Sequence, residues 1–107
     1  MTENRPDRRR HTRFPLGLPV GVRVAGRRKP LVVELLDISE SGARFQAMDN
    51  SVKVAERAVF GFVVPDRPSC QAQGLVVRAD RSGQFVLALD DTNDDFVGFV
   101  RCLEAES

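Results

Sequence analysis

Apolar and polar side chains alternate along the first half of the chain, in the pattern of half-buried strands. From Leu18 to Val24 every second residue is apolar, which predicts a strand with one buried face. Pro19 lies within this run and has no N–H to donate, so it is expected at an edge position or at the start of the strand. Two more β-rich runs follow at 31–38 and 43–48, each preceded by a polar turn.

The second half of the chain holds three further β-rich runs, at 58–64, 71–79 and 84–89. Segments rich in proline, glycine and polar residues separate them, as expected for turns. Gly74 falls inside one run and is a candidate β-bulge. A succession of short strands joined by turns predicts an antiparallel barrel or sandwich.

Near the C-terminus the apolar spacing changes to that of a helix, expected at about 92–104. Thr92 or Asn93 is placed to cap the first turn, where Asp94 and Asp95 suit the helix dipole. Apolar residues then recur at i, i+3, i+4 and i+7, and we interpret them as packing against the barrel rather than binding a ligand. These residues are Phe96, Phe99, Val100 and Leu103.

The chain has 107 residues, which fits one domain with a single modest core built from Val, Leu and Phe, since Trp and Tyr are absent. No apolar run approaches the roughly 20 residues of a membrane helix. The first thirty residues are too polar for a secretory signal, which predicts a cytoplasmic protein. Cys70 and Cys102 stand alone in apolar surroundings and are interpreted as reduced core thiols.

The positive charge is concentrated at the N-terminus. Residues 1–30 carry nine Arg or Lys and two acids, whereas residues 31–107 carry seven basic and thirteen acidic residues. Residues 1–13 are almost free of apolar side chains and are expected to form a flexible basic arm in front of the barrel and helix of 14–107. Such an arm attracts an anionic partner: a nucleic acid, a membrane surface or a phosphorylated small molecule.

Two short segments carry candidate binding chemistry. In the arm, 8–13 reads Arg-Arg-Arg-His-Thr-Arg, and guanidinium groups bind phosphate or the guanine edge through paired hydrogen bonds. His11 has no evident partner, so no metal site is expected there. The second segment, 37–42, reads Asp-Ile-Ser-Glu-Ser-Gly at a strand end. Taken alone, it is better interpreted as an ordinary strand-ending turn in which Gly42 supplies positive φ.

Both segments, in this order, resemble the PilZ family of cyclic di-GMP receptors. The family pattern RxxxR corresponds to Arg9 and Arg13, preceded by Arg8, and DxSxxG corresponds to Asp37, Ser39 and Gly42. The segment 14–20 also looks like the family's link into its first strand. The resemblance extends along the whole chain and implies an all-β fold, namely a six-stranded antiparallel β-barrel followed by a C-terminal α-helix.

The resemblance also implies a function and its residues. Arg9 and Arg13 are expected to hold guanine and phosphate, and Asp37 to read a guanine edge. Ser39 and Gly42 are expected to line the same pocket, with Arg8 as a third guanidinium that stacks on a second ligand molecule. The implied protein is a bacterial, non-enzymatic adaptor that binds cyclic di-GMP, needs no other cofactor, orders its arm over the barrel and signals through a partner protein.

One position departs from the family pattern. A late strand in the family reads approximately Gly-x-x-Phe, and the corresponding place here is 86–89, Val-Leu-Ala-Leu. Val86 in place of glycine is expected to weaken binding or to restrict the site to one ligand molecule. An alternative alignment uses Gly83 and Phe85 instead.

Three other functions remain open. A small barrel with a basic arm is also typical of nucleic-acid binders, although the absence of Trp and Tyr and the acidic barrel disfavour this. A PilZ-like interaction module without a ligand is a further alternative. An enzyme ranks last, because the sequence has no nucleophile motif, no Walker loop and no cluster of metal ligands.

Overall fold

The computed structural model describes residues 13–63 and 69–106. Among these residues, six strands precede one helix. Their bounds are β1 Phe14–Val24, β2 Leu31–Ile38, β3 Gly42–Gln46, β4 Arg57–Phe62, β5 Cys70–Ala79, β6 Gln84–Thr92 and α2 Asp94–Glu106.

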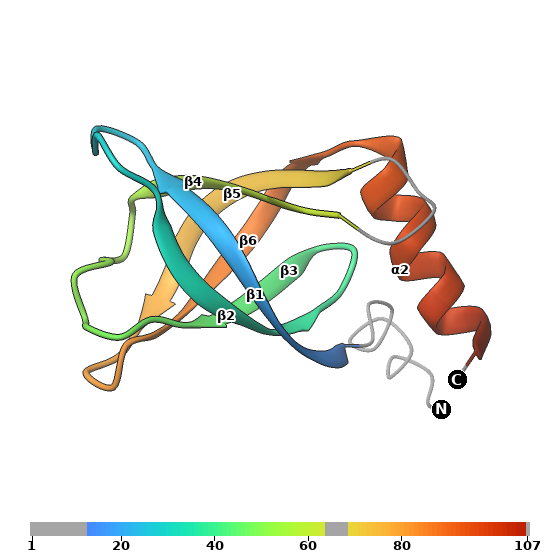
Figure 1. Cartoon of the computed structure of the whole chain (residues 1–107), viewed down its shortest axis with the longest axis horizontal. Helices are drawn as coiled ribbons and strands as arrows, with labels where there is room; N and C mark the ends of the chain where they lie inside the picture. Colours follow the sequence, from blue (N-terminus) through green and yellow to red (C-terminus); the bar gives the residue numbers. More distant parts are fainter. Residues whose placement is uncertain (1–12, 64–68, 107) are drawn as a thin grey trace, which may run out of the picture.

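The strands form a closed antiparallel barrel in the order β1-β2-β3-β6-β5-β4, and α2 lies at one end of it (Figure 1). The predicted six-stranded barrel with a C-terminal helix is therefore confirmed. Closure pairs every strand on both sides, which removes the exposed sheet edges of an open sheet. Within the described parts of the chain, no helix is long and apolar enough to cross a membrane.

The first strand starts earlier than the alternation predicts, at Phe14 instead of Leu18. A bulge between Pro15 and Leu18 allows this, with Gly17 at φ 68°, a value that L side chains rarely adopt. Pro19 pairs with β2, and pairing with β4 begins only at Gly21. The missing N–H of Pro19 therefore lies where β1 has one neighbour, as the edge interpretation predicted.

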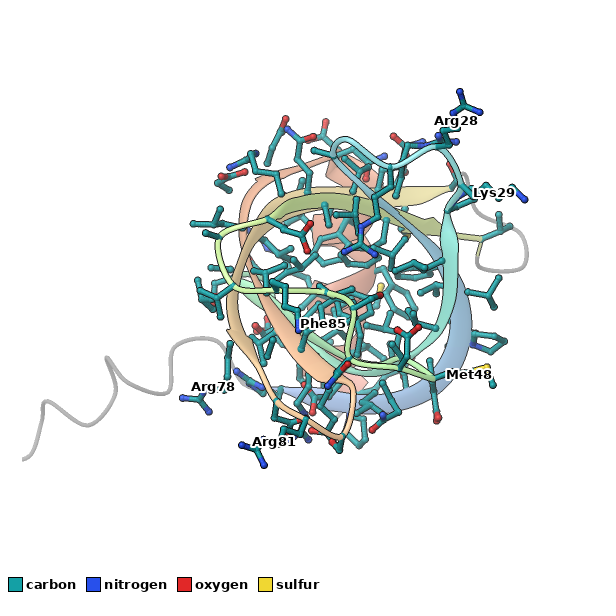
Figure 2. All side chains as sticks on the ribbon, turned by 90° about the vertical axis from the view of Figure 1, so that its left-hand side faces the viewer. Arg28, Lys29, Met48, Arg78, Arg81 and Phe85 are labelled. Atoms are coloured by element: carbon teal, nitrogen blue, oxygen red, sulfur yellow. The ribbon has the colours of Figure 1, made fainter. Side chains whose placement is uncertain are left out.

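Phenylalanines fill the barrel. The ring of Phe45 lies 4.9 Å from the rings of both Phe60 and Phe85, the first edge-on and the second stacked. Phe85 points inward among the strands (Figure 2), and all three side chains are almost completely buried. Aromatic pairs in these two arrangements stabilise a core beyond their buried area, by about 0.5–1.5 kcal/mol each.

The helix covers one end of the barrel. Phe96 and Val100 are fully buried, and the Phe96 ring lies 6.1 Å from Phe60. Of the two predicted caps, Asn93 is the one used, because its Oδ1 accepts the main-chain N–H of Phe96 at 2.9 Å. The apolar face of the helix therefore packs against the barrel, as predicted.

Three strands end two or more residues away from the predicted bounds, and one of them is β4, which ends at Phe62 instead of residue 64. The third strand stops at Gln46 instead of Met48, because the Gln46 side-chain amide donates to the carbonyl oxygens of Ala47 and Ser82 where the chain turns away. Met48 is consequently 99% exposed. The sixth strand continues to Thr92, three residues past the predicted Leu89.

The predicted bulge at Gly74 is confirmed by a register shift between Gln73 and Gly74 against β6. A Cβ at Gly74 would overlap the carbonyl oxygen of Ala88, so the glycine lets two backbones approach closely.

Gly74→Ala is expected to lower the free energy of unfolding by about 2 kcal/mol, because β5 and β6 must move apart. Gly98→Ala is the matched control, since a Cβ at this helical position meets open space. It should raise the free energy of unfolding by roughly 0.5–1 kcal/mol. Denaturant titration of both variants measures the difference, and equal stabilities would contradict this account of the β5–β6 contact.

Candidate functional site

Ser39 organises the turn between β2 and β3. Its hydroxyl oxygen accepts the main-chain N–H of Gly42 at 3.0 Å and of Ser41 at 3.3 Å, and the hydroxyl also lies 3.3 Å from the Gly42 carbonyl oxygen. The Ser39 N–H donates to the same carbonyl at 2.8 Å. With Ser39 only 3% exposed, these contacts occupy its hydroxyl inside the turn.

Gly42 does not adopt the positive φ that the turn interpretation expected; the positive-φ glycines are Gly17, Gly26 and Gly83. Gly42 is instead an extended residue at the start of β3, paired with Ala88 of β6. A Cβ at this position would lie 3.3 Å from the Leu87 carbonyl oxygen, tighter than an ordinary contact. The absence of a side chain at Gly42 therefore lets β3 and β6 approach closely, and no unusual backbone angle is involved.

Asp37 lies between two arginines. Its Oδ2 accepts from Arg44 Nε at 2.9 Å and Nη2 at 2.6 Å, and its Oδ1 lies 3.4 Å from Arg13 Nη1. The Asp37 side chain is 9% exposed, whereas those of Arg44 and Arg13 are 43% and 50% exposed. The carboxylate is thus buried beneath two half-exposed guanidinium groups.

The strand register places these three residues together. Asp37 pairs with Arg44 of β3 on one side and with Pro15 of β1 on the other. Because Pro15 follows Arg13 by two residues, the base of the arm lies beside the end of β2. The structure therefore brings one arginine of the RxxxR pattern into contact with the aspartate of DxSxxG.

A hollow of about 460 Å³ opens next to this ion-pair group. We call it the cationic hollow, because three arginines line it together with a single acidic residue. Its floor is the outer surface of β6, where Val86 pairs with Arg44 on one side and Arg78 on the other. The lining residues are Arg13, Arg44, Val77, Arg78, Asp80, Gln84 and Val86.

Val86 stands where the family pattern has a glycine, and its side chain lies at the site. Phe85 points into the core, and Gly83 lies in the β5–β6 turn at φ 95°, whereas Val86 lines the cationic hollow. The alignment that places Val86 at the family glycine therefore agrees with the geometry better than the alternative through Gly83 and Phe85.

Not every predicted site residue can be placed. Arg8 and Arg9 lie outside the described residues, as do Arg10 and His11. Of the predicted set, Arg13 lines the cationic hollow and Asp37 is bonded to two of its arginines, while Ser39 and Gly42 build the adjoining turn.

Sequence reasoning missed two arginines of this surface, Arg44 and Arg78. Arg44 stands two residues after the motif glycine, where the period of two in a strand predicts an outward side chain next to Asp37. Arg78 projects outward from β5 (Figure 2), and no hydrogen bond or ion pair joins it to the described residues. Its place beside Val86 depends on the bulge between Val76 and Arg78, which sequence alone does not locate.

The described residues contain no cluster of His, Cys, Asp or Glu suited to a metal ion. Cys70 is buried, and its thiol donates to the Asp95 carbonyl oxygen at 3.5 Å, so the core interpretation holds for this residue. Cys102 is only partly buried on α2.

Asp80 is the one acid among the described residues that line the cationic hollow. The Ser82 hydroxyl donates to Asp80 Oδ1 at 2.7 Å and lowers the pKa of this carboxyl below its ordinary value of 3.8, with help from the main-chain N–H groups of Ser82 and Gln84. Hydrogen bonds to the charged form favour that form. Asp80 therefore stays ionised at neutral pH and lowers the positive potential on its side of the cationic hollow.

Ser82→Ala is expected to raise the pKa of Asp80 toward its ordinary value, because the largest stabilising contact is lost. Carboxyl ¹³C NMR titration measures it, with Ser82→Thr, which keeps the hydroxyl, as the control. Since the folded pKa is depressed, the contact stabilises the fold above the ordinary Asp pKa and is lost as pH falls through the folded value. Identical Asp80 titrations in the alanine variant and the unaltered protein would contradict the assignment.

Comparison with known proteins gives one finding. The model of the PilZ domain family matches residues 7–104, which is nearly the whole chain and includes both sequence patterns. No curated protein matches the chain closely enough to count as a relative.

Proposed function

We propose, from the premise that the chain belongs to the PilZ domain family of cyclic di-GMP-binding domains, that it is a receptor for this second messenger. The ligand would sit in the cationic hollow and against the β2–β3 turn. Binding would change what the protein presents to a partner protein, so that it acts as an adaptor.

The contact between Arg13 and Asp37 is the observation that carries this proposal. It places a half-exposed guanidinium and a carboxylate at the edge of one hollow. Guanine offers N–H donors along one edge, which a carboxylate accepts, and its O6 and N7 accept from arginine. The phosphates of the ligand are matched by the charges of Arg44 and Arg78.

The size of the hollow agrees with a ligand of this kind. Its volume of about 460 Å³ lies within the range of roughly 300–1,000 Å³ that is usual for small-molecule sites. Val77 and Val86 add apolar surface between the arginines, on which a flat base can rest.

The arm completes the proposed site. By family resemblance, Arg8 and Arg9 add two guanidinium groups to that of Arg13. If the segment before Arg13 becomes ordered only when the ligand binds, the entropic cost of ordering it is part of the binding free energy. Ligand binding then changes the surface that a partner protein contacts.

Arg13→Ala and Asp37→Ala are expected to weaken cyclic di-GMP binding by about 10- to 100-fold each, because each removes a charged hydrogen-bonding partner. Arg23→Ala is the matched control: Arg23 is an exposed arginine of β1 that does not line the hollow. Calorimetry measures affinity, and circular dichroism verifies the fold.

Unchanged affinity in both site variants would refute the placement of the ligand. Tight binding of single-stranded DNA or RNA with a steep salt dependence, and none of cyclic di-GMP, would instead support the nucleic-acid alternative.

Val86 leads to a prediction of stoichiometry. Its side chain occupies the floor between Arg44 and Arg78, where a glycine would let a ligand approach the backbone. We expect the unaltered protein to bind one ligand molecule per protomer. The Val86→Gly variant should bind the ligand several-fold more tightly. Ala88→Gly is the control, an exposed position of the same strand outside the hollow. Two ligand molecules bound per unaltered protomer would contradict this role of Val86.

A further inference from the structure

Arg44 lines the cationic hollow and also contacts the Asp37 carboxylate. Two of its nitrogens, Nε and Nη2, bond to the same carboxylate oxygen, Oδ2, at 2.9 and 2.6 Å. The other oxygen, Oδ1, has only the longer 3.4 Å contact with Arg13. The carboxylate is therefore held firmly on one side and weakly on the other.

The two hydrogen bonds from Arg44 fix the orientation of the Asp37 carboxylate. Charge-assisted hydrogen bonds at these distances are short and directional. The backbone supports them, because Asp37 and Arg44 are directly paired residues of β2 and β3, and Arg44 is paired in turn with Val86 of β6. Rotation of the Asp37 side chain would break both bonds and leave a buried charge poorly compensated.

A carboxylate reads guanine through two parallel hydrogen bonds, from the ring N1–H and the exocyclic 2-amino group. That recognition needs the accepting oxygen in the plane of the base and facing both donors, so it depends on a fixed carboxylate. Each carboxylate oxygen has two lone-pair sites, and Arg44 Nε and Nη2 occupy both sites of Oδ2. Oδ1 is therefore the oxygen that accepts the two guanine donors, once it exchanges its long contact with Arg13.

We infer that Arg44 is a positioning residue for guanine selectivity: it holds Asp37 in the orientation that distinguishes guanine from bases without a 2-amino group. This inference rests on the proposed function and deepens it. Arg78 has a different role in the same hollow. It has no ion pair within the described residues, so it supplies charge for phosphate without orienting Asp37.

The test compares cyclic di-GMP with its inosine analogue, cyclic di-IMP, which lacks the 2-amino group and is otherwise the same dianion. The unaltered protein should bind cyclic di-GMP at least about tenfold more tightly, because the analogue leaves a carboxylate acceptor unfilled. Arg44→Ala should reduce this ratio to near one, mainly by weakening cyclic di-GMP binding. Asp37→Ala should also abolish the preference.

Two further variants separate positioning from charge. Arg78→Ala should weaken both ligands by a similar factor and leave their ratio intact, because it removes charge alone. Arg44→Lys keeps the charge but loses the paired nitrogens, so it should recover part of the affinity for both ligands without recovering the preference. Circular dichroism and thermal unfolding verify that each variant is folded.

Two results would overturn the inference: an unchanged ligand ratio in Arg44→Ala, which would make Arg44 a simple phosphate-attracting charge, or tighter cyclic di-GMP binding in that variant, which would make Arg44 a competitor for Asp37. An unaltered protein that binds neither dinucleotide would overturn the proposed function and this inference with it.

Discussion

The buried carboxylate of Asp37 is the constraint on which the rest of the site depends. A charge removed from water must be compensated, and here two guanidinium groups compensate it from different segments of the chain. One comes from the residue just before β1 and the other from β3. The same interaction therefore joins three neighbouring segments of the barrel and gathers positive charge at one place on its surface.

The barrel holds Asp37 and the residues around it in a fixed geometry. Asp37, Arg44, Val86 and Arg78 follow one another across β2, β3, β6 and β5 as paired residues. Sites built on paired strands hold their side chains more precisely than sites built on loops. The part described here thus forms a rigid half of the proposed site, and the family pattern assigns the complementary half to Arg8 and Arg9.

The strands and the helix followed from the sequence, because alternation, helical spacing and turn residues are local signals. The contact between the two motif segments was expected only from the resemblance to the family. The parts that sequence reasoning missed depend on register. Gly42 was expected to need positive φ but instead permits close approach to Leu87. Arg78 reaches the site only because β5 is bulged beside it. The Ser39 hydroxyl is occupied within the turn, and the expectation that Ser39 lines the ligand pocket stays a prediction.

The most direct test is a map of amide chemical-shift changes in the ¹⁵N-labelled protein during titration with cyclic di-GMP. The largest changes should fall at Arg13, at 37–44 and on the outer surface around Arg78 and Val86. Changes gathered instead on the β1–β4 surface around Val59, or an absence of changes at saturating ligand, would contradict a binding site built around Asp37.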